Sequence, residues 1–429
     1  MDVSGKNFKA FIDRQAALKK QYSSKNAEKQ HSKGKLTAHE RINLLFDSGT
    51  FEEIDAFVTP ASQPVEFGKV DRTYGDGVIV GHGKINGRLI FAYAQDFTIM
   101  GGSLGLVHSK KITKIQEMAL KMGAPIIGMM DSGGARIQEG VASLSGYASI
   151  FQNIISSSGI IPQISVIMGP AAGGAVYSPA LTDFVFMVSH TSYMFVTGPN
   201  VVKEVLNEDV TSEGLGGAEV HARKSGVANM IYDDEENTIL ALKKFLSYLP
   251  SNNVENPPVI ADDGSISDYN EKLRDIVPDD PNKAYDVKDV INQVVDRHSF
   301  FEISELFGAS LVIGFGRMRG KTIGIVANQP KVRREPPPDQ AWEIIRRYQR
   351  LVILAARNHL YRMECLRQAL TLKKLLGGQG IVTELRFGIR KEAKQLLAHA
   401  WLEYEGHSIE LSHNGNDHFE PLTILKDRQ

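Results

Sequence analysis

The chain has 429 residues, of which 42% are hydrophobic, and this length and composition can supply two or three domains with large cores. Its 49 Lys and Arg against 50 Asp and Glu give a formal net charge of −1, so no overall charge favours nucleic acid or a membrane surface as a partner. An N-terminus without a signal-peptide pattern, the lack of an apolar run near the roughly 20 residues that span a bilayer, and a single cysteine, Cys365, predict a cytoplasmic protein without an internal disulfide.

The N-terminal region is rich in lysine and poor in acidic residues. The pattern over residues 5–30 predicts a polar helix, and a solvated helix face explains its charges. Short β-rich segments broken by glycines follow between residues 51 and 94. Apolar residues at helical spacing then predict a helix over residues 107–122.

Three buried-strand patterns are each followed by glycines and then by a helical pattern. In open α/β sheets, ligands bind beyond the carboxyl ends of the strands. The three turns therefore predict one site at a sheet edge, built from backbone groups more than from charged side chains. The strands are expected at residues 89–97, 124–131 and 160–167, and the glycines after them are Gly101, Gly102, Gly105, Gly133, Gly134, Gly140, Gly173 and Gly174.

The third turn contains the strongest candidate for chemistry. Without a Cβ at Gly173 and Gly174, a ligand oxygen can approach the main chain closely, and unpaired N–H groups at a helix start attract negative charge. The turn therefore predicts an oxyanion hole. A tight packing contact that requires glycine is the alternative, and this stretch by itself leaves both open.

Further strand and helix patterns over residues 184–247 extend a mixed α/β core. His221 lies in this region, and a structural histidine with satisfied hydrogen bonds is the favoured interpretation. No cluster has the spacing of metal ligands, and no Walker or Rossmann fingerprint is present. Loop-forming residues over 249–265 mark a boundary, and a second unit begins over residues 285–328.

Four motifs of this first part resemble one family. They are KGKLTAHERINLLFD, FTIMGGSLG, DSGGARIQEG and MGPAAGGAVYSPALTDF, which begin at Lys33, Phe97, Asp131 and Met168. Together they resemble the carboxyltransferase subunit of biotin-dependent acyl-CoA carboxylases of the propionyl-CoA or methylmalonyl-CoA type, collinearly from about residue 8 to about residue 332. The resemblance implies a crotonase-like (ClpP/crotonase) α/β lobe over residues 1–256. It also implies the incomplete start of a second such lobe over residues 257–332.

The resemblance also implies a function for the glycine turns. A short-chain acyl-CoA, such as propionyl-CoA, would lie along the first lobe, with its thioester oxygen held by Gly173 and Gly174. The carboxyl group would come from carboxybiotin on a separate carrier protein. A biotinylated carrier or biotin carboxylase subunit is the implied partner, and the carboxyltransferase lobes would form a homo-oligomer. No metal is implied.

The incomplete second lobe is expected to impair carboxyl transfer. A non-catalytic acyl-CoA-binding remnant is an alternative. His39 stands where family members often have arginine, which removes one charge near the expected coenzyme A phosphates. The residues expected to contact acyl-CoA are Lys35, Arg41, Gly101, Gly102, Ser103, Lys110, Gly133, Gly134, Ala135 and Arg136, with Lys33 extending the positive charge.

After a proline-rich linker at residues 333–339, the chain changes character. An arginine-rich amphipathic helix is expected first, then a helix that contains Cys365, and then two strands, of which the second contains His399. A helix with cysteine followed by a strand with histidine is the chain order of transglutaminase-like and papain-like cysteine enzymes. A small buried hydrophobe is the alternative interpretation of Cys365.

The segments CLRQALTLKKLL, ELRFGIR and AHAWLEYEG resemble the B2 protein of lasso-peptide biosynthesis, a leader-peptide-cleaving cysteine protease, over residues 340–429. The resemblance implies a small α+β domain of the papain/transglutaminase-like type, with Cys365 as nucleophile, His399 as general base and a precursor peptide as substrate. Leu411 occupies the position of the family's acid, which leaves Glu410 or Asp417 as a substitute. Peptide cleavage by this domain is thus the alternative function.

Overall fold

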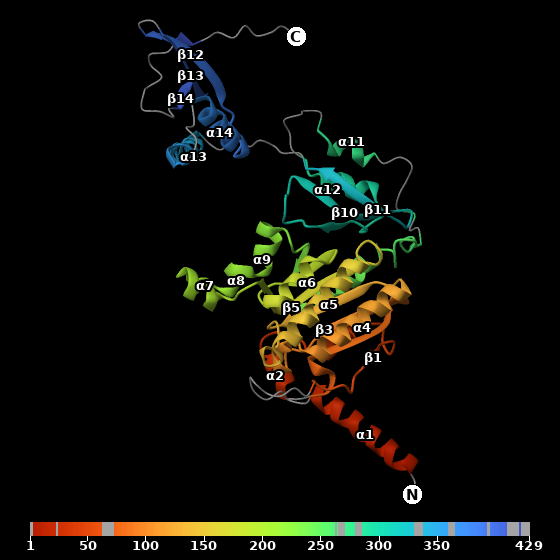
Figure 1. The fold of residues 1–429 in the computed structure, drawn as a ribbon. Helices are drawn as coiled ribbons and strands as arrows, with labels where there is room; N and C mark the ends of the chain where they lie inside the picture. The colour runs from red at the N-terminus through yellow and green to blue at the C-terminus, as the bar shows by residue number, and fades with distance from the viewer. Residues whose placement is uncertain are drawn as a thin grey trace. The chain divides into compact units, whose positions relative to one another are not determined.

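The computed structural model of the protein describes residues 3–22, 25–61, 73–261, 264, 271–278, 285–329, 338–358, 365–392, 395–409 and 420–421. The chain divides into two units (Figure 1). The first contains Met1–Asp279 and Tyr285–Pro330, and the second contains Asp280–Ala284 and Lys331–Gln429. The boundaries expected from the sequence at residues 256, 332 and 339 remain predictions.

The first unit is built on one mixed sheet. The strands run in the order β1-β2-β3-β4-β5-β6-β8, with β7 paired to β5 beyond this path. The pairs β1–β2 and β2–β3 are antiparallel, and every pair from β3 onward is parallel. The strands are β1 (Glu52–Ile54), β2 (Val78–Ile85), β3 (Arg88–Gln95), β4 (Ile126–Ser132), β5 (Gln163–Ala172), β6 (Phe184–Val188), β7 (Tyr193–Phe195) and β8 (Met230–Tyr232).

Helices cover both faces of this sheet. All seven residues of β4 are buried, as its nearly continuous apolar sequence requires of a central strand. One core joins the sheet to α3 and α10, and a second core joins the opposite face to α4 and α5, which lie side by side in Figure 1. The longer helices are α1 (Val3–Tyr22), α2 (Lys25–His31), α3 (Ala38–Leu45), α4 (Leu106–Met122), α5 (Val141–Ser157), α7 (Pro199–Leu206) and α10 (Glu235–Leu246).

Short helical segments connect these elements. The expected polar helix over residues 5–30 is two helices, α1 and α2, and the turn after β5 leads into a helix of only four residues, α6. The short segments are η1 (Tyr74–Gly77), η2 (Met100–Gly102), η3 (Ile137–Glu139), η4 (Gly173–Val176), α6 (Tyr177–Ala180), α8 (Ser212–Gly216), α9 (Ala218–Val220) and η5 (His221–Ser225).

A smaller antiparallel sheet completes the first unit. Its strand order is β11-β10-β9, and α12 packs on it through a core of Ile291, Val295 and Val312. The Ser304 N–H donates to the Asn229 carbonyl oxygen at 2.9 Å, which joins the two sheets just after β9. The elements are α11 (Lys272–Ile276), α12 (Val287–Val294), β9 (Phe301–Ile303), β10 (Leu311–Met318) and β11 (Lys321–Asn328).

The second unit places two helices against an antiparallel sheet. The sheet has the order β14-β13-β12-β15. Leu372 and Leu376 of α14 share a buried core with Leu402 of β13, and this contact follows from the amphipathic pattern of α14. The elements are α13 (Pro338–Asn358), α14 (Cys365–Gly378), β12 (Glu384–Glu392), β13 (Gln395–Tyr404), β14 (His407–Ile409) and β15 (Glu420–Pro421).

Candidate active site at three glycine turns

The three predicted turns meet at one edge of the main sheet. They follow β3, β4 and β5, which are adjacent and parallel, so their carboxyl ends lie together. The Gly133 N–H donates to the Gly101 carbonyl oxygen at 3.0 Å, and the Leu104 N–H donates to the Gly134 carbonyl oxygen at 2.9 Å. Gly134 also lies against the end of β5, where a Cβ would come 2.8 Å from the Ala172 oxygen. The three turns therefore form one continuous surface of backbone.

Several of these glycines are needed for packing. A Cβ at Gly102 would overlap the Asp131 carbonyl oxygen, and φ is +63° there. A Cβ at Gly174 would come 2.8 Å from two ring carbons of Tyr147. The packing interpretation, which the sequence left open, therefore applies to Gly102, Gly134 and Gly174.

Gly173 is different. Its φ is +57°, which favours glycine, and a Cβ built there would have no atom within 4 Å. The residue is half-buried. Gly173 is therefore the position in the third turn where a ligand has room to approach the main chain.

The backbone N–H groups of the first two turns also differ from those of the third. In the turns after β3 and β4, four of them already donate within the protein: Gly102 to Ile99 O, Ser103 to Met100 O, Gly133 to Gly101 O and Gly134 to Ser132 Oγ. Among the described residues, the N–H groups of Gly173 and Gly174 donate no turn or cap hydrogen bond. They begin a helical turn, and the first N–H groups of a helix have no partner inside it. The N–H groups of the turn after β5 are therefore the candidate donors to a ligand at this edge.

Beneath the turns lies a buried set of ion pairs. Asp131, at the end of β4, receives Lys35 Nζ at 2.6 Å and Arg41 Nη1 at 2.9 Å. Arg41 also pairs with Glu235 of α10 at 2.7 Å. Burial alone would lower the pKa of Arg41, but the Asp131 and Glu235 carboxylates raise it above its ordinary value. These pairs fix the start of α3 to both strand β4 and helix α10.

A capping box sets the position of Arg41. The Thr37 hydroxyl accepts the Glu40 N–H at 3.2 Å, and the Glu40 carboxylate accepts the Thr37 N–H at 2.8 Å. This arrangement starts α3 with a fixed orientation. Arg41, one residue later, consequently points into the protein.

Two of the predicted acyl-CoA contacts, Arg41 and Arg136, lie in buried ion pairs. Arg41 is 1% exposed and Arg136 is 0% exposed, and both guanidinium groups bind carboxylates of the protein. Removing such a cation from its partners would leave buried carboxylates uncompensated, which costs about 3–5 kcal/mol. Both guanidinium groups are thus used within the protein, and a direct contact of these two side chains with coenzyme A stays a prediction.

The other predicted cations differ in accessibility. Lys35 is buried, and burial lowers its pKa although Asp131 opposes the change. Lys33 and Lys110 are exposed, and they remain predicted contacts for a phosphate-bearing ligand. His39 stacks on the Tyr22 ring with centroids 4.7 Å apart, so it does not extend the charged surface. Ser103 and Ala135 line the turns and are half-buried.

Sequence reasoning missed the residues that support the turns. Asp131 closes an apolar run, and an acid at the end of a buried strand signals a need for cationic partners. Tyr147 lies on α5 in an ordinary helical pattern, and Asp76 lies in a turn-forming stretch, so neither had a signal of its own. Tyr147 is identified only by its contact with the Gly174 turn, and Asp76 only by its ion pair with Arg136.

His221 is a structural histidine, as the sequence predicted. Its Nε2 bonds the Met194 carbonyl oxygen at 2.8 Å, and its Nδ1 bonds the Ser225 hydroxyl at 2.9 Å. Both ring nitrogens are therefore used to close the turn before Gly226. The histidine has no nitrogen left for a ligand.

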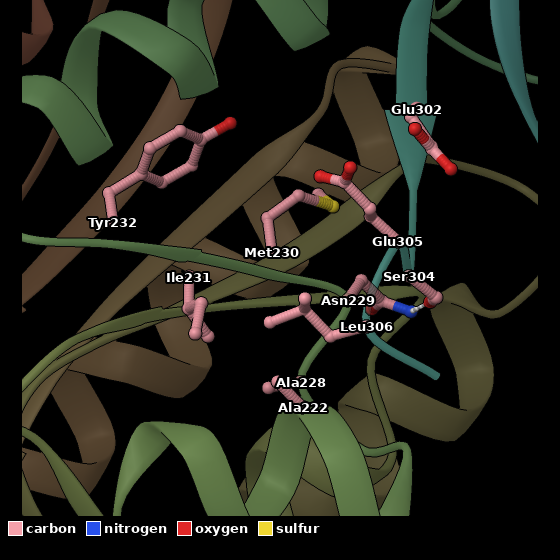
Figure 2. Close-up of a pocket in the computed structure, with 10 residues that line it drawn as sticks. All are labelled: Ala222, Ala228, Asn229, Met230, Ile231, Tyr232, Glu302, Ser304, Glu305 and Leu306. Carbon is pink, nitrogen blue, oxygen red and sulfur yellow. Dashed lines mark hydrogen bonds between the residues drawn. The ribbon is translucent and has the colours of Figure 1, made fainter. Parts of the chain in front are cut away.

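A cavity of about 150 Å³ lies elsewhere in the first unit, between β8 and the segment after β9 (Figure 2). Figure 2 shows the Asn229 amide hydrogen-bonded to Ser304, with the Glu302 and Glu305 carboxylates on the β9 side. Lys288 pairs with both carboxylates, at 2.6 Å and 2.8 Å. The lining contains no residue of the three glycine turns, so this cavity is separate from the candidate site.

In the second unit, the predicted catalytic residues are only partly described. Cys365 is the first residue of α14, and its side chain lies outside the described residues. His399 lies on β13 opposite Gly388, and its ring stacks on Trp401 with centroids 6.0 Å apart. The predicted acids, Glu410 and Asp417, also lie outside the described residues, as does Leu411.

Comparison with known families identifies the first part of the chain. Residues 29–361 match the family described as carboxyl transferase domain. The chain belongs to this family. Residues 311–423 match a second family, described as transglutaminase-like superfamily, and the two matches overlap over residues 311–361. The resemblance of the first part and the predicted fold class are confirmed, and the second match supports a transglutaminase-like C-terminal region.

Relatives of the carboxyl transferase domain family are similar over about three quarters of the chain. The propionyl-CoA carboxylase beta chain of Roseobacter denitrificans is 51% identical over 321 residues, which cover 75% of this chain and 62% of the relative. The methylmalonyl-CoA decarboxylase subunit alpha of Veillonella parvula is 49% identical over 318 residues, covering 74% and 62%. The chain therefore spans less than two thirds of the length of these curated relatives.

A solved structure of the same family has a similar fold. It is the transcarboxylase 12S, described as a hexamer with methylmalonyl-CoA and methylmalonic acid bound. It is 44% identical, with a TM-score of 0.73, and the match covers 78% of this chain and 64% of that one.

None of the helices in the part of the chain that the structure describes combines the length and apolar character that crossing a membrane requires.

Proposed function

We propose that the first unit binds a short-chain acyl-CoA and supports carboxyl transfer at its α-carbon. The observation that carries this proposal is the open turn at Gly173, whose two N–H groups donate no turn or cap hydrogen bond among the described residues, at the carboxyl ends of three adjacent parallel strands. A thioester carbonyl oxygen fits this turn because it can approach a residue without a Cβ. Membership of the carboxyl transferase domain family supports the assignment.

The chemistry follows from where charge develops. In the enolate form of an acyl-CoA, the negative charge lies largely on the thioester oxygen. The N–H groups of Gly173 and Gly174 would donate to this oxygen and stabilise it more than the neutral carbonyl. Removing one donor of this kind typically lowers the rate about 10²–10³-fold. No side-chain nucleophile is required.

The substrate class is proposed from the relatives. The similar proteins are described as acting on or binding propionyl-CoA and methylmalonyl-CoA, which differ by one carboxyl group on the α-carbon. We place the same pair of substrates at the Gly173 turn. Lys33 and Lys110 are exposed and are proposed to meet the phosphates of coenzyme A.

The carboxyl donor is proposed to be carboxybiotin on a separate carrier protein. The described part of the second sheet contains only β9, β10 and β11. No step is therefore assigned to biotin in this chain. A homo-oligomer is proposed on the similarity to transcarboxylase 12S, which is described as a hexamer.

Titration calorimetry with propionyl-CoA and with coenzyme A tests the site. G173A places a methyl group where the thioester oxygen would lie, and G159A is its matched control, because φ is +73° there and a Cβ would also have no atom within 4 Å. Both variants should lose about 1–2 kcal/mol of stability, since each forces alanine into the left-handed region.

Only G173A should weaken propionyl-CoA binding, by about tenfold or more, because a hydrogen bond to a polarised oxygen contributes about 1.5 kcal/mol. Coenzyme A itself should bind G173A within about twofold of the wild-type affinity, since a twofold change is only about 0.4 kcal/mol. Failure of the wild-type protein to bind propionyl-CoA would refute the proposal, as would an equal loss in G159A.

A second candidate function belongs to the second unit. We propose that Cys365 and His399 form the reactive pair of a thiol hydrolase. The supporting observations are the match to the transglutaminase-like superfamily, the place of Cys365 at the start of α14, and the packing of α14 against β13, which contains His399. Cleavage of a precursor peptide remains a prediction of the sequence.

The rate of Cys365 alkylation by iodoacetamide against pH tests this pair. Beside an imidazolium, a thiol ionises below the unperturbed value of about 8.5, so the wild-type protein should react in mildly acidic solution and H399A should not. H407A, which removes a histidine of the neighbouring strand β14, is the control and should follow the wild type. Coincident curves for wild type and H399A near the free-thiol value would exclude the pair.

A further inference from the structure

Arg136 lies at the centre of a buried cluster between the first two glycine turns. Its Nη1 donates to Asp76 Oδ1 and to Glu139 Oε1, each at 2.6 Å. Its Nη2 donates to the Ser103 carbonyl oxygen at 2.9 Å. One guanidinium group therefore binds the turn after β3 while its own backbone belongs to the turn after β4.

The two carboxylates that bind Arg136 also bind the start of α4. Glu139 Oε2 accepts the Leu106 N–H at 2.7 Å, and Asp76 Oδ2 accepts the His108 N–H at 2.8 Å. Gly105 precedes α4 and offers no side-chain cap, so these carboxylates satisfy N–H groups of the helix start. The positive end of α4 is thus occupied by groups of the protein and is not free for an anion.

The backbone of the two turns pairs around this cluster. Leu104 donates its N–H to Gly134 O at 2.9 Å, and Arg136 donates its N–H to Leu104 O at 3.0 Å. A Cβ at Gly105 would overlap both the Arg136 guanidinium and the Glu139 carboxylate. The side-chain cluster and the backbone ladder therefore define a single position of one turn relative to the other.

We propose that Arg136 is a positioning residue, which locks the turns after β3 and β4 together and so sets the surface on which the Gly173 turn rests. The lock reaches the third turn through Gly134, which lies against Ala172. The consequence for ligand binding depends on the proposed acyl-CoA site, whereas the locking of the two turns does not. Arg136 itself touches no ligand, because it is fully buried.

Hydrogen exchange of the backbone, followed by mass spectrometry, tests the lock without any ligand. In R136M, exchange of segments 100–106 and 133–140 should be at least about tenfold faster, because the Ser103 contact is lost and the two carboxylates that cap α4 lose the cation that holds them in place. R88M is the matched control. Arg88 is partly buried and also donates to oxygens of the protein, at Leu246 and Ser251, but it lies at the opposite end of β3.

A second variant keeps the test decisive if R136M does not fold. R136M/E139Q removes one of the two carboxylates that would otherwise lose their cation, while it still deletes the contact to Ser103. R136K keeps a positive charge, so exchange of these segments in R136K should be slower than in R136M and closer to the wild-type rate. If folded R136M and R136M/E139Q both exchange these two segments at the wild-type rate, the lock does not exist.

Ligand affinity separates positioning from general destabilisation. The preference for propionyl-CoA over coenzyme A, measured by calorimetry, should shrink at least about fivefold in R136M and recover partly in R136K, whereas R88M should keep the wild-type preference. An unchanged preference with faster exchange would overturn the link to the site. A wild-type protein without any preference would instead refute the proposed thioester site, and the exchange result would still decide the lock.

Discussion

The turn after β5 and the turns after β3 and β4 have the same sequence character and different structural roles. In the first two turns, glycines at positions 102 and 134 let backbones touch, and their N–H groups are bonded within the protein. In the third turn, Gly173 faces open space, and its N–H has no turn or cap bond among the described residues. Two turns build a rigid support, and the third presents the donors.

The two regions also differ in charge. The support stands on buried ion pairs around Asp131 and Arg136, whereas residues 173–176 are Gly, Gly, Ala and Val and contain no titratable group. A neutral turn held by a charged, buried framework can stay in place without a side chain that competes for the ligand oxygen. Glycines in turns of the same sequence character are therefore not equivalent.

The largest expected effect is on stability in the support. G102A should lose at least about 4 kcal/mol of unfolding free energy, because the methyl group would overlap the Asp131 oxygen in addition to the strain of a positive φ. G101A is the control, since φ is also +63° but no atom lies within 4 Å, and it should lose only about 1–2 kcal/mol. Urea denaturation measures both. Equal losses of stability in G102A and G101A would mean that the close contact between Gly102 and the Asp131 carbonyl oxygen does not contribute to stability.

The next effect is the change in unfolding free energy with pH that the buried Lys111 causes. Lys111 donates to the Gly75 and Val78 carbonyl oxygens, and burial lowers its pKa to about 8 from 10.5, against the attraction of Glu53. Between pH 8 and 10.5 the unfolded state binds more protons at this residue, so stability rises with pH by up to about 3 kcal/mol.

The difference in unfolding free energy between wild type and K111M isolates this contribution, because K111M lacks the titrating group. The difference should shift in favour of the wild type as the pH rises from 8 to 10.5. K121M, which removes an exposed lysine of the same helix, should show no such shift relative to the wild type. A flat difference for K111M would show that Lys111 is charged and solvated.

A smaller effect is expected where the open turn meets its support. G174A should lose about 1–3 kcal/mol, because its methyl group must displace the Tyr147 ring, which lies 2.8 Å from the Cβ position. G324A is the control, as a Cβ in strand β11 would meet nothing within 4 Å, and its stability should change by less than about 0.5 kcal/mol. If G174A is as stable as the wild type, the Tyr147 contact does not hold the turn.

The sequence by itself determined the framework of the site. Apolar runs followed by glycines at residues 101, 133 and 173 predicted buried strands with their turns at one edge of a sheet, because a buried strand needs an apolar sequence and a tight turn needs glycine. The motifs around these runs also predicted the family, which the comparison confirms. Local pattern was sufficient for each of these conclusions, since strand, turn and motif are encoded within about ten residues.

Only the tertiary structure decided which groups the site can use. Lys35, Arg41 and Arg136 were predicted to face a ligand, and the structure pairs them with carboxylates at positions 131, 235 and 76, most of them far away in the sequence. Likewise, the difference between Gly173 and Gly174 depends on Tyr147, which another element supplies. A charge or a missing Cβ acquires its role from the atoms that surround it, and those atoms come together only when distant segments fold against one another.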